Sequence, residues 1–100
     1  MPIFERLPHN FGGSRKRAAL LRAELEEQLD EHTRVTVDFS GVEVTQSFVD
    51  ELVGVLVLRD GPAILKRLTF KGCSRDVQAL LRFVCQTRAN DFLGQAPHPH

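Results

Sequence analysis

The chain has 100 residues, of which 42% are hydrophobic and 26% are charged, and its 13 basic residues balance its 13 acidic ones. This length and composition are typical of one globular domain and argue against a second domain or extensive disorder. The zero net charge offers no general attraction to nucleic acid or acidic membranes. Because the N-terminus lacks a signal-peptide core and no apolar run approaches ~20 residues, we expect a cytoplasmic protein without membrane contact.

The first half of the chain predicts a helix followed by a strand. The first 13 residues are irregular and leave room for an N-terminal edge strand at 2–7. A helix is expected over 14–31 with Ser14 as its N-cap, and an alternating, β-branched strand over 34–39. The apolar stripe of this helix recurs at three- and four-residue spacing through Ala18, Leu21, Leu25 and Leu29.

A second helix is predicted over 47–58. Ser47 would cap it, and Asp50 three residues later would complete a shortened capping box. Residues 52–58 alone fit a buried strand as well as a helix, and the cap favours the helix. In a helix Gly54 costs about 1 kcal/mol relative to alanine, which indicates close packing against a neighbouring element.

The last part of the chain predicts a strand and a final helix. The strand is expected over 65–71, and the helix over 74–88 with Ser74 as its cap. We expect residues 91–100 to form a flexible tail. The apolar stripe of the last helix is predicted to contain Val77, Leu80, Leu81 and Val84.

This order predicts a small α/β domain over residues 14–90 with a short, mainly parallel sheet. Two strands alone make a poor sheet. We therefore expect either the segment 1–13 or a second chain to cover an edge, so a homodimer is compatible with the sequence.

The most distinctive motif links the first predicted strand to the second helix. The strand ends in Asp38-Phe39-Ser40-Gly41-Val42, and a short loop leads to Ser47-Phe48-Val49-Asp50-Glu51. Over roughly residues 12 to 88 the chain resembles STAS domains, the fold of bacterial anti-sigma-factor antagonists. It is most similar to a STAS-like family of unknown function that carries the Ser-Phe-x-Asp-Glu segment.

The resemblance implies a bacterial signalling module in transcription regulation. Its partner would be a histidine-kinase-like ATPase or an anti-sigma factor, and phosphorylation of a loop serine would break the complex. The antagonists commonly read Asp-Ser-Ser-Gly at this loop, with phosphate on the second serine. Here Gln46 replaces the aspartate, Ser47 matches the first serine and Phe48 occupies the acceptor position. Ser47 and Thr45 remain the candidate phosphoacceptors, and phosphorylation becomes optional.

We therefore expect a non-catalytic, partner-binding module without a cofactor or metal. The two cysteines, Cys73 and Cys85, lack metal-site spacing and are expected to be reduced thiols. Phe48 and Val49 would serve as apolar anchors if they faced outward. The candidate partner-binding residues are Thr45, Gln46, Ser47, Phe48, Val49 and Glu51.

An alternative function is the binding of nucleic acid or a phosphate ligand at the start of the first helix. Glycines followed by a capping serine and three cations can hold an anion at a helix N-terminus. Such binding would be steeply salt-dependent. The candidate anion-binding residues are Gly13, Ser14, Arg15, Lys16 and Arg17.

Overall fold

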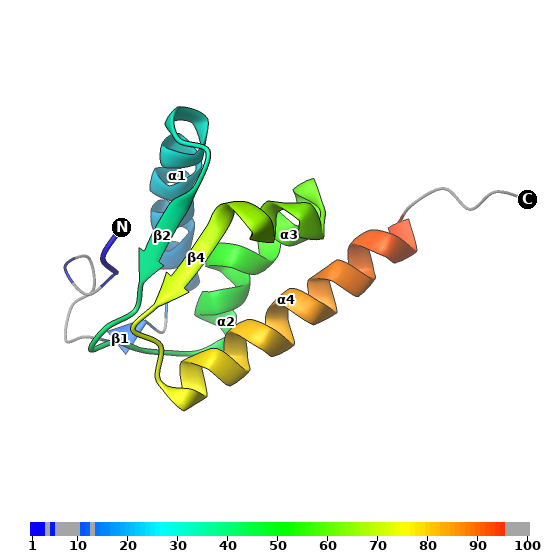
Figure 1. Ribbon diagram of the computed structural model, residues 1–100. Coiled ribbons are helices and arrows are strands. Elements are labelled where there is room, and N and C mark those ends of the chain that lie inside the picture. Colours follow the sequence, from blue (N-terminus) through cyan, green and yellow to red (C-terminus); the bar gives the residue numbers. More distant parts are fainter. Residues whose placement is uncertain (4, 6–10, 13, 96–100) are drawn as a thin grey trace, which may run out of the picture.

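The computed structural model describes residues 1–3, 5, 11–12 and 14–95 and has the predicted small α/β architecture (Figure 1). Gly13, a candidate anion-binding residue, lies outside the described residues. So do parts of the expected edge strand at 2–7 and of the expected tail at 91–100. In chain order the elements are β1 (Phe11–Gly12), α1 (Arg15–Glu31), β2 (Val35–Asp38), β3 (Glu43–Val44), α2 (Gln46–Val49), the π-helix η3 (Asp50–Gly54), α3 (Val55–Asp60), the 3-10 helix η4 (Pro62–Arg67), β4 (Leu68–Lys71) and α4 (Arg75–Gln95).

The central sheet pairs β2 with β4 in parallel, as predicted, in a register that runs from Val35 opposite Leu68 to Asp38 opposite Lys71. The N-terminal segment adds to it through a parallel bridge between Pro2 and Asp38. Residues 2–7 were expected to supply an edge strand, and the part of that range that the structure describes supplies this bridge. β1 and β3 form a second, two-residue parallel pair that was not expected.

Residues 46–60 form one continuous helical segment, the central helical segment, which lies between α1 and α4 (Figure 1). The helix rather than the strand interpretation of 52–58 is therefore confirmed. Packing on two sides explains why this segment is apolar around most of its circumference, since Leu52, Val53, Leu56 and Val57 are all buried.

The predicted apolar stripes form the core. Ala18, Leu21, Leu25 and Leu29 of α1 are all buried, and the strand residues Val35 and Val37 pack in the same cluster. In α4, Val77, Leu81 and Val84 are buried and Leu80 is partly buried. No helix within the described ranges is long and apolar enough to cross a membrane.

Two predicted boundaries were wrong, whereas the second helix, expected from about 47, begins within one residue of that position, at Gln46. Residues 65–67, expected at the start of a strand, belong to η4, and the strand begins at Leu68. α4 continues beyond 88 to Gln95, so residues 91–95 of the predicted tail are helical.

Candidate functional site

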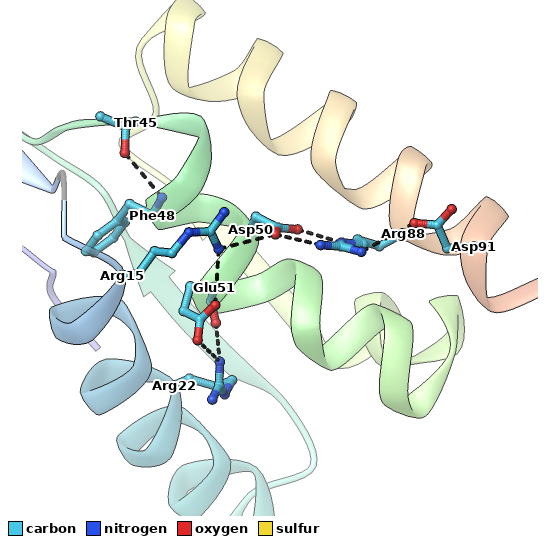
Figure 2. Close-up of polar contacts among 8 residues, drawn as sticks. All are labelled: Arg15, Arg22, Thr45, Phe48, Asp50, Glu51, Arg88 and Asp91. Atoms are coloured by element: carbon cyan, nitrogen blue, oxygen red, sulfur yellow. Dashed lines mark hydrogen bonds and ion pairs between the residues drawn. The ribbon is translucent and has the colours of Figure 1, made fainter.

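The Asp50-Glu51 pair joins the central helical segment to both flanking helices (Figure 2). The Asp50 carboxylate accepts two hydrogen bonds of 2.7 Å from Nε and Nη2 of Arg88 on α4. Arg15 Nη1 on α1 lies 3.7 Å from Asp50 Oδ2 and 3.3 Å from Glu51 Oε2. A bidentate arginine–carboxylate pair is among the strongest charged contacts in proteins, so this network fixes the relative positions of three helices.

Glu51 completes the network on the α1 side. Arg22 Nη1 lies 3.3 Å from Glu51 Oε1 and donates a 2.6 Å hydrogen bond to the backbone oxygen of the same residue. Glu51, predicted to bind a partner, therefore uses its carboxylate within the molecule.

Hydrogen bonds from Arg88 lower the pKa of Asp50, against the opposing effect of desolvation. The same contact raises the pKa of Arg88. The Asp50 side chain is only 14% exposed. Asp50 is therefore a fixed anion at neutral pH, held by its arginine and unsuited to proton transfer.

Gly54 leaves room for this pair. A Cβ atom on Gly54 would overlap Asp50 Oδ1 and lie 2.9 Å from Val84 Cγ1 and 3.2 Å from Arg88 Cγ. The close packing predicted from Gly54 is thereby confirmed, and the element it faces is α4.

Thr45, not Ser47, caps the central helical segment. The Thr45 hydroxyl accepts a 3.2 Å hydrogen bond from the Phe48 backbone N–H (Figure 2). The predicted Ser47–Asp50 capping box is wrong because Ser47 already lies in the first turn and Asp50 turns toward Arg88.

Phe48 and Val49 are fully buried and belong to the core. The prediction that they serve as partner anchors is wrong, because an anchor must be accessible before binding. At the start of α2, the side chains that reach the surface are therefore those of Gln46, which is exposed, and Ser47, which is half-buried.

A cleft of about 330 Å³ opens beside Gln46 and Ser47. Phe83, 55% exposed, stands on its α4 side, and the sequence analysis did not select it. The sequence contained one sign of this exposure, because Phe83 lies outside the apolar stripe formed by Val77, Leu81 and Val84. The cleft is lined by Arg15, Gln46, Ser47, Asp50, Phe83, Val84, Thr87 and Arg88.

The basic start of α1 is divided in the structure. The Ser14 hydroxyl caps the helix by accepting a 3.2 Å hydrogen bond from the Arg17 N–H, as predicted. All three side chains are exposed, but Arg15, at 57% exposure, also pairs with Asp50 and Glu51. The three cations therefore do not act together, because one of them is paired with carboxylates.

A second hollow, of about 500 Å³, lies at the carboxyl ends of β2 and β4, where parallel sheets often bind ligands. The Ser40 hydroxyl and backbone N–H both donate to Asp38 Oδ1, and these bonds lower the pKa of Asp38. Gly72, with φ of 68°, packs against the same two residues. These contacts hold the turn that follows β2 against the residue that follows β4.

The thiols are poorly suited to nucleophilic chemistry. Both cysteines are free, and burial raises the pKa of Cys73 and raises that of Cys85 to about 11. Within residues 1–3, 5, 11–12 and 14–95, no group of three or more potential metal ligands lies together.

Comparison with known proteins places the chain in one family. No curated protein and no solved structure matches the sequence significantly. A family model matches residues 17–78, which include α1 from Arg17 onward, both strands of the main sheet, the central helical segment and the Asp50-Glu51 pair. This match extends over more than half of the chain. The protein belongs to the family of STAS-like domains of unknown function (DUF4325).

Proposed function

We propose that this protein is a non-catalytic regulatory module that binds a partner protein through the cleft between the start of α2 and α4. The partner we propose is a histidine-kinase-like ATPase, the class bound by the STAS domains of anti-sigma-factor antagonists. Gln46 and Ser47, which the sequence analysis named as partner-binding residues, remain part of the proposed contact surface. Phe83 takes the place of the buried Phe48 and Val49 as its apolar anchor.

The exposure of Phe83 beside the cleft carries this proposal. A phenylalanine that is 55% exposed leaves a large apolar area in water, and its burial by a partner would be favourable. Aromatic side chains flanked by polar groups are typical centres of protein interfaces. Gln46, Ser47 and Thr87 supply such polar groups around the same cleft.

The charges in the cleft support binding rather than catalysis. Asp50 and Arg88 neutralise each other through two short hydrogen bonds, and Arg15 contacts two carboxylates. A general base needs a free group whose pKa lies near neutrality, whereas the pKa of Asp50 is lowered. A surface whose charged groups are paired suits recognition of a folded partner.

Phosphorylation of Ser47 is the proposed optional switch. Ser47 lines the cleft, whereas the Thr45 hydroxyl already caps the helix. A phosphate on Ser47 would add nearly two negative charges beside Asp50 and would change the contact surface. We therefore place regulation at Ser47 in preference to Thr45.

Purification of the tagged protein from its natural host under native conditions tests the proposal. We expect a histidine-kinase-like ATPase to co-purify, as identified by mass spectrometry. Phe83→Asp should reduce the recovered partner at least tenfold, because a central aromatic anchor typically contributes more than about 1.4 kcal/mol to binding. Intact mass of the same sample reports any phosphate on Ser47.

Leu93→Asp is the matched control, because Leu93 is 59% exposed on the same helix but does not line the cleft. This variant should retain the partner. Equal recovery with both variants would remove the cleft from the proposed interface. Salt-dependent retention of nucleic acid without a protein partner would instead favour the exposed Lys16 and Arg17.

A further inference from the structure

The outer edge of β4 lacks a neighbouring strand. Among the described residues, β4 pairs with β2 alone. The Phe39 N–H donates a 2.9 Å hydrogen bond to Lys71 O, so the Lys71 backbone is turned toward β2. Because successive residues of a strand direct their backbone polar groups to opposite sides, those of Phe70 are turned to the outer edge.

A groove runs between this edge and α4. Its volume is about 400 Å³; it is separate from the cleft that holds Phe83 and adjoins the hollow at the strand ends, with which it shares Gly72. Phe70 is half-buried at the strand side, and Leu81 is nearly buried at the helix side. The groove is lined by Phe70, Gly72, Cys73, Gln78, Leu81 and Arg82.

The charge of the groove is positive. Among the residues that the structure describes, Arg82 is the one charged residue that lines the groove, and Arg75 lies two helical turns earlier on the same face of α4. Lys71 ends the edge strand and is 64% exposed, and its ammonium group lies 3.8 Å from the Asp38 carboxylate. Arg82 and Arg75 disfavour pairing of β4 with β4 of a second copy, since the same positive groups would meet across the new interface.

We propose that the β4 edge and α4 form a strand-addition site for an extended, acidic segment of a partner protein. The segment would exchange backbone hydrogen bonds with Phe70, place alternate apolar side chains between Phe70 and Leu81, and direct carboxylates toward Arg82 and Arg75. Strand addition beside a helix is a recurrent mode of peptide recognition, in which the backbone gives affinity and the pockets give specificity.

This site stands independently of the proposed function. Its lining residues on α4 are Gln78, Leu81 and Arg82, whereas those of the first cleft are Phe83, Val84, Thr87 and Arg88. One helix thus serves two separate surfaces, and each can fail without the other.

A random dodecapeptide library, selected in parallel on the wild-type protein and on Arg82→Glu, tests the proposal. We expect wild type to enrich peptides in which apolar residues alternate with aspartate or glutamate. One enriched peptide, synthesised and titrated, should bind Arg82→Glu at least tenfold more weakly. The matched control is Arg34→Glu, which reverses an exposed charge just before β2 and should leave the affinity unchanged.

Hydrogen exchange resolved at single amides distinguishes strand addition from other binding. The Phe70 amide should exchange fast in the free protein and slow at least tenfold with the peptide, while the Lys71 amide changes little. Binding without protection of Phe70, or no enrichment of acidic peptides, would overturn the proposal. Protection of Phe70 in a concentration-dependent dimer without peptide would do so as well, because a second copy would then occupy the edge.

Discussion

The absence of a Cβ atom at Gly54 leaves room for the contact between Asp50 and Arg88. Its φ of −59° and ψ of −39° are ordinary helical values, so backbone freedom does not require glycine here. Helix propensity alone predicts that Gly54→Ala stabilises the protein by about 1 kcal/mol. The new Cβ would instead collide with Asp50, Val84 and Arg88.

We therefore predict that Gly54→Ala lowers the free energy of unfolding by about 1–3 kcal/mol, the usual range for overpacking. Urea denaturation at neutral pH measures the change. A stabilised Gly54→Ala variant would contradict the tight contact between the central segment and α4. Gly94→Ala serves as the control, because nothing lies within 4 Å of a Cβ at that helical position.

The Asp50–Arg88 pair predicts a pH dependence at the residue scale. Because the folded state lowers the pKa of Asp50, its contribution to stability is complete above the unfolded value of about 3.9 and is lost as pH falls through the folded pKa. We predict that Asp50→Asn costs about 1 kcal/mol at pH 7, allowing for partial solvent screening, and less at pH 3.

Chemical denaturation of wild type, Asp50→Asn, Arg88→Gln and the double variant at both pH values isolates the coupling between the two side chains. The coupling should be present at pH 7 and reduced at pH 3. A coupling that is equal at both pH values would show that charge pairing is not its source.

At the scale of elements, the start of the central helical segment gives the sharpest test. Thr45 and Ser47 are both hydroxyl residues near the same helix end, but only Thr45 caps the Phe48 N–H. We predict that Thr45→Ala lowers the free energy of unfolding by ~1 kcal/mol, and that Ser47→Ala changes it by less than about 0.5 kcal/mol. The reverse order in thermal or urea denaturation would restore Ser47 as the cap.

The elements that sequence predicted correctly are those with strong local signals. The apolar stripe of α1 repeats four times, and β2 alternates, so both were located within one residue. The start of the strand expected at 65–71 was misplaced by three residues, because Lys66 and Arg67 are adjacent and the alternation of apolar and polar residues begins only at Leu68. Pro62 after Gly61 starts a 3-10 turn that continues to Arg67.

The length of α4 was underestimated because its last turns depend on contacts across the molecule. Asn90 and Gly94 are weak helix formers, which suggested an end near 88. In the structure the Phe92 ring lies against Gly61 at the end of α3, where a Cβ would approach to 2.9 Å. Periodicity within one segment does not report such tertiary support.

At the scale of the whole molecule, the candidate site joins residues that are far apart in sequence. The motif from Asp38 to Glu51 directed attention to the start of α2, but spacing could not reveal that Asp50 pairs with Arg88 and Glu51 with Arg15 and Arg22. The three cations at the start of α1 suggested an anion site, because the sequence does not show that Arg15 pairs with Asp50 and Glu51. Only the fold shows which charges neutralise each other, and that Phe83 is an exposed apolar side chain beside the cleft.

Site-specific photocrosslinking tests the central claim, partner binding at the Phe83 cleft, most directly. Photoreactive benzoylphenylalanine would replace Phe83 in one variant and Leu93 in another, both produced in the natural host and irradiated. The account predicts one discrete covalent adduct from position 83, identified as a histidine-kinase-like ATPase, and none from position 93. No protein adduct at position 83, or the same adducts from both positions, would contradict it.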